Sequence, residues 1–241
     1  MNDRYQRLPS RFLGRKVHLW THGHAGQPVL VFPSAAGMAH EWQHAGAVEA
    51  LGDLLEAGKI QLICPESNVS EAWTGEGDPR WKLQRHRAYE QFIAEELIPW
   101  VQAKTGHARV VTAGCSFGSF YASNFALKYP ELVRWALCLS GRYRTESFMD
   151  GYYDDSVYFA DPLHYVPNLG GTDLQRARRT ALTLVVGLGP FEGRCIQETH
   201  DMAWVLGQKG IPHEADIWGH DVAHDWTWWK RQLRFHLRRL G

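Results

Sequence analysis

Short, almost continuous apolar runs alternate along the chain with longer segments in which apolar residues recur at helical spacing. Such runs are typical of strands buried on both faces of a sheet, and the longer segments are typical of helices that cover it. We predict strands at Lys16–Trp20, Val29–Pro33, Ile60–Cys64, Arg109–Gly114, Trp135–Ser140, Leu182–Gly187 and His213–Trp218. We predict helices at Glu41–Ala57, Leu83–Lys104, Phe117–Tyr129, Arg194–Gln208 and Asp225–Leu240.

This alternation predicts an α/β fold with a mostly parallel central sheet and helices on both faces. In such sheets, functional sites lie beyond the carboxyl ends of the strands. The segment Thr21–Pro28 joins the first two strands too closely for a crossover helix, so we expect the sheet to begin with an antiparallel pair. No repeat or linker interrupts the pattern, and the sequence therefore predicts one domain over residues 1–241.

Residues 141–181 interrupt this rhythm, because roughly forty residues pass there without a clear strand or helix. The segment is rich in tyrosine, phenylalanine and aspartate. One interpretation is an irregular excursion packed by its own aromatic side chains. The other is a cap-like insertion that covers the site and shapes a substrate pocket.

The segment Gly114-Cys115-Ser116-Phe117-Gly118 is the strongest chemical signal. It reads Gly-x-Ser-x-Gly, and it joins a predicted strand to a predicted helix. This is the setting of a nucleophile elbow, a sharp turn that exposes a serine hydroxyl above the sheet at a helix N-terminus. The alternative is an ordinary glycine-rich turn, but the rest of the chain offers the partners that a nucleophilic Ser116 needs.

A serine nucleophile needs a base, and in this type of sheet the base is a histidine that follows the last strand. Two histidines qualify, His220 and His224. We favour His224 because it stands directly before the last predicted helix.

The base needs an acid to orient it. Glu192 is the carboxylate in the loop after the strand Leu182–Gly187, and we predict it to be that acid. A glutamate near a helix start can also simply stabilise the helix dipole. Asp161 and Asp155, in the insertion, are the fallback acids.

The oxyanion of an acyl-transfer intermediate needs two backbone N–H donors. We expect one from Phe117, which follows the nucleophile. The other should come from the loop Pro33–Gly37, where Pro33 has no N–H, so Ser34 and Ala35 remain. We favour Ala35.

Composition excludes several classes of protein. The formal net charge is zero, with no basic excess of the kind that nucleic-acid binders carry. No run is long enough to span a membrane, and the start shows no signal-like apolar core, so we expect a cytoplasmic protein that does not bind membranes. The four cysteines are scattered, which argues against a disulfide framework or a zinc site.

With these residues in view, the chain resembles the α/β-hydrolase superfamily, and within it the esterase D-like group of serine hydrolases. The elbow, the loop Phe32–Gly37 and the segment Gly219–Trp226 carry the resemblance, together with the later Trp229. The resemblance implies a serine hydrolase that acts on esters or thioesters without a metal or organic cofactor. The chain departs from the usual His-Gly pair, with Pro33-Ser34 in its place. Its acid resembles the glutamate of mycolyltransferase-like relatives more than the commoner aspartate.

The leading hypothesis is therefore a carboxylesterase that cleaves small or medium acyl esters through an acyl-enzyme on Ser116. An acyltransferase or a peptidase would use the same triad, and a non-catalytic binding protein would keep only the fold. A homo-oligomer is compatible with the exposed helices. The aromatic residues that we name as substrate-binding, each equally compatible with a place in the core, are Trp73, Tyr143, Tyr152, Tyr153 and Trp226.

Overall fold

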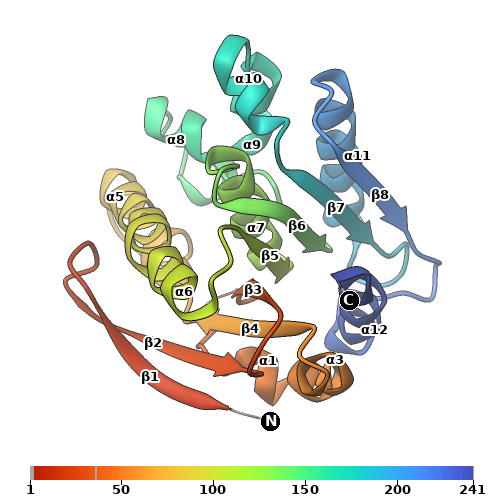
Figure 1. The fold of residues 1–241 in the computed structure, drawn as a ribbon. Coiled ribbons are helices and arrows are strands. Elements are labelled where there is room, and N and C mark those ends of the chain that lie inside the picture. The colour runs from red at the N-terminus through yellow and green to blue at the C-terminus, as the bar shows by residue number, and fades with distance from the viewer. Residues whose placement is uncertain (1–2, 36, 241) are drawn as a thin grey trace.

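In the computed structural model, residues 3–35 and 37–240 are described, and over these ranges eight strands form one sheet in the order β1-β2-β4-β3-β5-β6-β7-β8 (Figure 1). Ala36 of the predicted oxyanion loop and the chain ends lie outside the described residues. The strands are β1 Arg4–Ser10, β2 Arg15–His22, β3 Gln27–Phe32, β4 Ile60–Pro65, β5 Val110–Cys115, β6 Val133–Leu139, β7 Ala181–Val186 and β8 His213–Ile217. The predicted fold class is confirmed, and the seven predicted strands correspond to β2 through β8.

The helices surround this sheet. They are α1 Glu41–His44, α2 Ala47–Ala50, α3 Gly52–Glu56, α4 Val69–Ala72, α5 Pro79–Phe92, α6 Ile98–Thr105, α7 Phe117–Lys128, α8 Asp155–Ala160, α9 Pro162–Tyr165, α10 Gly171–Ala177, α11 Gly193–Gln208 and α12 Trp226–Leu237. A π-helical turn, η1 Ile93–Leu97, joins α5 to α6. The short 3₁₀ segments are η2 Glu146–Phe148, η3 Val166–Asn168 and η4 Arg238–Leu240. Across the described ranges, no helix is long and apolar enough to cross a bilayer.

The alternation of side chains along β3 divides the core into two layers. Leu30 and Phe32 join one apolar cluster with α5, α7 and α11, whereas Val29 and Val31 join a second cluster with α1 to α3 and α12. Figure 1 shows α1, α3 and α12 on one side of the sheet and α5, α7 and α11 on the other. The central strands are therefore buried on both faces, as their apolar runs predict.

The prediction that the sheet begins with an antiparallel pair is right about the direction of β2 and wrong about the strand with which β2 pairs. The strand β2 is antiparallel, but it pairs with β1 and β4, because β4 lies between β2 and β3. Gly23 and Gly26 make this possible, since both have φ near 90° and both run tightly against the backbone at the start of β4. The short segment between β2 and β3 therefore crosses the position of β4, which the length of the segment alone does not reveal.

The predicted helix over Glu41–Ala57 is in fact three short helices. Gly46 adopts a left-handed conformation with φ of 74° and separates α1 from α2. The strand β1 was not predicted, because only one of its side chains is buried and its residues are mostly polar. Both differences arise where local backbone geometry or an edge position overrides the apolar pattern.

The insertion, residues 141–181, contains α8, α9 and α10 and is anchored by two buried carboxylates. Glu198 of α11 accepts hydrogen bonds from the backbone N–H groups of Tyr143 and Arg144, at 2.5 and 2.9 Å. Asp161 accepts from the backbone N–H groups of Thr145, at 2.7 Å, and Leu163, at 3.0 Å. The start of the insertion is therefore fixed to α11 by the Glu198 carboxylate, whereas Asp161 ties two parts of the insertion to each other.

Candidate active site

Ser116 stands on a strained turn between β5 and α7. Its backbone has φ of 55° and ψ of −120°, and its side chain is half-buried. A Cβ atom on Gly114 would collide with the backbone of Gly118, and a Cβ atom on Gly118 would collide with the carbonyl group of Phe32 at the end of β3. The two glycines are therefore required by close approach, and they bring the end of β3 next to the serine.

His224 connects Ser116 to Glu192. Its Nε2 atom lies 3.0 Å from Ser116 Oγ, and its Nδ1 atom lies 3.1 Å from Glu192 Oε2. The next residue, Asp225, caps α12 by accepting the N–H of Thr227 at 2.7 Å, and the Trp229 ring packs nearly perpendicular to the imidazole. The helix start thus fixes the histidine, and the three predicted residues lie in the order that a serine triad uses.

Glu192 is fully buried, and both of its oxygen atoms have partners. One oxygen faces His224, and the other accepts from Ser140 Oγ at 2.5 Å and from the N–H of Gly187 at 3.3 Å. Trp229 Nε1 in turn donates to Ser140 Oγ at 2.9 Å. The contribution of Ser140 was not predicted, although its position directly after β6, at the carboxyl edge of the sheet, was a signal that could have found it.

Backbone strain gathers around this relay. Four non-glycine residues in the described ranges have positive φ, and three of them are Ser116, Ser140 with 49° and Phe191 with 65°. Phe191 precedes Glu192. Strained backbone of this kind is held in place by its surroundings and clusters at functional sites.

The other candidate acids and the other candidate base lie elsewhere. Asp161 caps α9 and binds Thr145, and burial raises the pKa of its carboxyl group. Asp155 and His220 are exposed. The structure therefore brings together Glu192 and His224 with Ser116, and it does not bring the alternatives to them.

The predicted oxyanion donors are arranged differently from the expectation. The N–H of Phe117 donates to the carbonyl oxygen of Ser34 at 3.0 Å, so the first donor is already occupied. The N–H of Ser34 donates to Glu41 Oε1 at 2.9 Å, and burial of Glu41 raises the pKa of its carboxyl group in spite of this bond. Ala35 is exposed. The Ser34 carbonyl group would have to move before Phe117 could bind an oxyanion.

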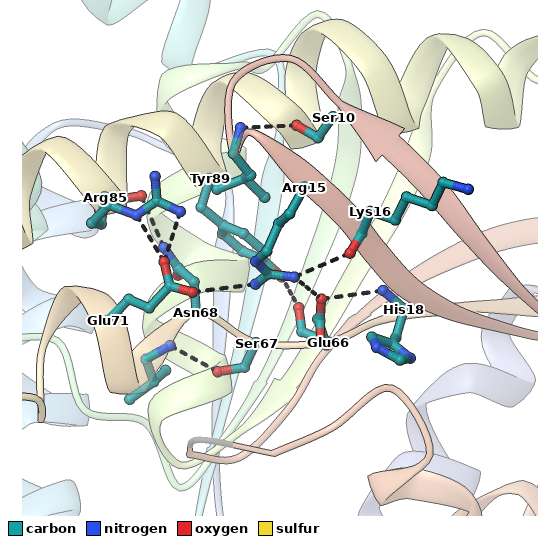
Figure 2. Close-up of polar contacts among 12 residues, drawn as sticks. Ser10, Arg15, Lys16, His18, Glu66, Ser67, Asn68, Glu71, Arg85 and Tyr89 are labelled. Atoms are coloured by element: carbon teal, nitrogen blue, oxygen red, sulfur yellow. Dashed lines mark hydrogen bonds and ion pairs between the residues drawn. The ribbon is translucent and has the colours of Figure 1, made fainter.

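A polar cluster next to this loop holds the turn that follows β4 (Figure 2). Glu66 is buried, and its carboxylate accepts from the guanidinium of Arg15 and from the N–H of His18, the latter at 3.1 Å. The following residue, Ser67, donates its hydroxyl to the carbonyl oxygen of Ala35 at 2.8 Å. The Arg15–Glu66 ion pair, in which only the carboxylate is buried, is therefore linked through one turn to the loop that carries the predicted oxyanion donors.

The five aromatic residues named as substrate-binding do not form one pocket. Trp73 and Tyr143 are 1% and 0% exposed and belong to the core, so they offer no surface to a ligand in this structure. Tyr152 binds Asp154, Tyr153 is exposed, and Trp226 packs against other tryptophans near the triad. The expectation is corrected for Trp73 and Tyr143, because aromatic side chains of the same composition can serve a core or a pocket.

A cleft of about 830 Å³ lies between α5, the end of α7 and α8. Of the aromatic residues named above, Tyr152 lines it, and the triad residues do not. Near the triad the insertion contributes Arg142, whose N–H donates to the carbonyl oxygen of Ser116 at 3.4 Å, and Phe148 of η2, which packs against Phe117. The insertion therefore covers the flank of α7 more than the serine itself.

One set of side chains at the site could hold a metal ion. Glu192, Cys195 and His224 each offer a ligand atom, and these atoms lie within 4.8 Å of one another. The Cys195 Sγ atom lies 3.8 Å from His224 Nδ1.

The family model described as "Putative esterase" matches residues 10–240. Among solved structures, the fold is similar to that of a ferulic acid esterase, with a TM-score of 0.77, 18% identity and coverage of 99% of this chain and 97% of the other. It is also similar to a fluorophosphonate-binding serine hydrolase of Staphylococcus aureus (TM-score 0.75, 14% identity, 99% and 97% covered). An S-formylglutathione hydrolase of Staphylococcus aureus gives a TM-score of 0.71 at 14% identity, with 100% and 99% covered. No curated protein matches the chain in sequence.

Proposed function

The chain belongs to the "Putative esterase" family, and from that premise we propose that it is a serine carboxylesterase that cleaves small or medium acyl esters through an acyl-enzyme on Ser116. The observation that carries the proposal is the relay from Ser116 through His224 to the buried Glu192, with contacts of 3.0 and 3.1 Å. Its hydroxyl, imidazole and carboxylate lie at the distances that proton transfer requires. The four cysteines are free and buried, which supports the expectation of a reducing, cytoplasmic compartment.

In this mechanism, His224 Nε2 takes the proton of Ser116 as Oγ attacks the ester carbonyl carbon, and the imidazolium is stabilised by Glu192. The proton then passes to the leaving alcohol, and an acyl-enzyme remains. Water, deprotonated by the same histidine, attacks the acyl group and restores the serine. No step needs a metal ion or an organic cofactor.

The oxyanion of each tetrahedral intermediate would be bound by the N–H groups of Phe117 and Ala35. Because Phe117 N–H is bonded to the Ser34 carbonyl oxygen, binding of substrate must displace that carbonyl group. We propose that the ester oxygen takes its place. Because Gly118 has no side chain, the end of β3 lies close enough to Ser116 for the ester oxygen to replace the Ser34 carbonyl oxygen.

The test is hydrolysis of p-nitrophenyl esters, from acetate to octanoate, by the native chain and by Ser116→Ala. We expect a loss of roughly 10⁵-fold or more in kcat for the variant, because the residues of a triad act as a unit. A fluorophosphonate probe should label the native chain and leave Ser116→Ala unlabelled. Absence of both labelling and turnover in the native chain would favour the non-catalytic alternative.

Two histidine variants assign the base. His224→Ala should be as damaging as Ser116→Ala, whereas His220→Ala should keep the native rate, because His220 is exposed. The reverse result would move the base to His220. Competition between water and added alcohols or amines during deacylation separates hydrolysis from acyl transfer.

A further inference from the structure

Cys195 lies three residues after Glu192, in the first turn of α11, so both side chains point to the same side of the helix. Its thiol faces the Nδ1 edge of His224 at 3.8 Å, and that edge also faces Glu192 Oε2 at 3.1 Å. Burial raises the pKa of the Cys195 thiol to about 12, with the Glu192 carboxylate adding to the effect. The proposed ester hydrolysis makes no use of this thiol.

The spacing of these atoms fits a tetrahedral metal. Zinc–sulfur bonds of about 2.3 Å and zinc–nitrogen or zinc–oxygen bonds of about 2.0 Å place a nitrogen and an oxygen ligand about 3.3 Å apart, and a sulfur and a nitrogen ligand about 3.6 Å apart. The corresponding distances in the protein are 3.1 and 3.8 Å. All three ligand atoms lie within 4.8 Å of one another, so side-chain shifts of up to about an ångström would bring them to a common centre.

The donor types agree with this geometry. A thiolate, an imidazole and a carboxylate together favour zinc over magnesium or calcium, which prefer oxygen ligands. Glu192 Oε1 is already held by Ser140, so Oε2 is the oxygen that remains for His224 or for a metal. The arrangement supplies three protein ligands and leaves a fourth position for water or an anion.

We propose that Cys195, His224 and Glu192 form an inhibitory binding site for zinc or another thiophilic divalent cation. Binding releases the thiol proton to solvent, and the metal takes the Nδ1 atom of His224. The proton of the neutral imidazole then resides on Nε2. A protonated Nε2 cannot accept the proton of Ser116, so a bound cation switches off the base.

Entry to the site is restricted but not closed. Glu192 and Cys195 are buried, whereas the His224 side chain is 19% exposed. The loop that leads into Glu192 carries the exposed Pro190 and Phe191, and Phe191 has a strained backbone. A small cation can therefore reach the donors along His224 or through a local opening of this loop.

The binding test uses Co²⁺ as a spectroscopic substitute for zinc, added to the full chain until the spectrum is constant. We expect a thiolate-to-cobalt charge-transfer band in the native protein, its removal by stoichiometric Zn²⁺, and its absence in Cys195→Ala. Cys64→Ala, which removes a buried thiol from β4, is the matched control and should keep the band. No band in the native protein, or an equal band in Cys195→Ala, would overturn the proposal.

The inhibition test rests on the proposed function, so it is separated from the binding test. Zn²⁺ should inhibit ester hydrolysis reversibly, with recovery on chelation, and Cys195→Ala should need at least about tenfold more Zn²⁺ for half-inhibition relative to its own metal-free rate. Equal sensitivity would place the inhibitory ion elsewhere and overturn the proposal. The cobalt measurement on Ser116→Ala tests the site even if the chain proves to have no esterase activity.

Discussion

The acid–base half of the candidate site and its oxyanion half are built from different material. Side chains that follow β5, β7 and β8 form the first half, and each of them has its partner at hydrogen-bond distance. Backbone N–H groups form the second half, and there the Phe117 donor is occupied by the Ser34 carbonyl oxygen. The first half is ready for proton transfer, whereas the second requires a peptide group to move.

The contrast follows from how each half is supported. Glu192 is buried and held by three elements of the fold through Ser140, Gly187 and Trp229. The loop after β3 is held through its backbone groups instead: Glu41 accepts the N–H of Ser34, and Ser67 donates its hydroxyl to the carbonyl oxygen of Ala35. Preorganised dipoles supply much of the rate enhancement in acyl transfer, so the state of this loop should limit activity.

Glu192→Gln breaks the acid–base half directly. The amide can accept from His224 but cannot stabilise an imidazolium, and it can hold the imidazole in the wrong tautomer. We expect kcat to fall by roughly 10⁴-fold with little change in the fold, as measured by ester hydrolysis and circular dichroism. Asp161→Asn is the matched control, a buried carboxylate of the insertion that should affect stability and not rate. If Asp161→Asn were the more damaging of the two, the acid would lie in the insertion.

Ala35→Pro breaks the oxyanion half. Proline removes the N–H that we expect to bind the oxyanion, and loss of one such donor costs roughly 10²- to 10³-fold in kcat. KM should change much less, because the bond forms in the transition state. Ala35→Gly keeps the N–H and should stay near the native rate. A proline variant with native kcat would shift the second donor to the N–H of Ser34.

Ser140→Ala tests how much the hydrogen bonds behind Glu192 contribute to the function of the acid–base half. The variant takes one donor from Glu192 and leaves the Trp229 N–H without its acceptor. We expect a loss of about tenfold in kcat, equivalent to about 1.4 kcal/mol. Ser123→Ala is the control, since that buried hydroxyl donates to the carbonyl oxygen of Ser119 within α7, and it should leave kcat unchanged. Equal effects of the two would reduce Ser140 to a structural role.

The same contrast explains what the sequence could predict. Ser116 and Glu192 follow strands with strong apolar patterns, whereas His224 follows the mostly polar β8. Topology places a base after the last strand and an acid after an earlier one, so position alone was enough to predict the three residues that the structure brings together. Ser140 also ends a strand, but an isolated serine carries no sign that its backbone will adopt a φ of 49° and direct the hydroxyl to a carboxylate.

The oxyanion loop and the start of the sheet were harder for a related reason. The direction of the Ser34 carbonyl group is a peptide orientation, and residue types set it only weakly. The place of β4 between β2 and β3 depends on long-range pairing. For Trp73 and Tyr143, named as substrate-binding but equally compatible with the core, the structure decides for the core, because apolar character alone does not distinguish the two environments.

A substitution at Glu90 changes the stability of the fold that supports both halves of the site, without touching either half. It lies in α5 and binds the Lys128 ammonium, at 2.8 Å, at the far end of the helix that begins beside Ser116. Burial raises the pKa of Glu90, but Lys128 and His86 outweigh it and hold the pKa at about 2, below its ordinary value of 4.5. The lowered pKa contributes about 3 kcal/mol to the free energy of unfolding at neutral pH.

Because the folded-state pKa is depressed, this contribution is complete above about pH 4.5 and is lost as the pH falls towards 2. Glu90→Gln should therefore lower stability at pH 7 by about 3 kcal/mol and flatten the fall in stability below pH 4.5, as measured by urea unfolding. Activity at pH 7 should be unchanged, since neither half of the site is touched. Arg176→Gln, which removes an exposed pair with Glu131, should leave the acid limb as it is. A drop in kcat for Glu90→Gln would show instead that the position of α7 is transmitted to Ser116, and the two halves would no longer be independent of the framework below them.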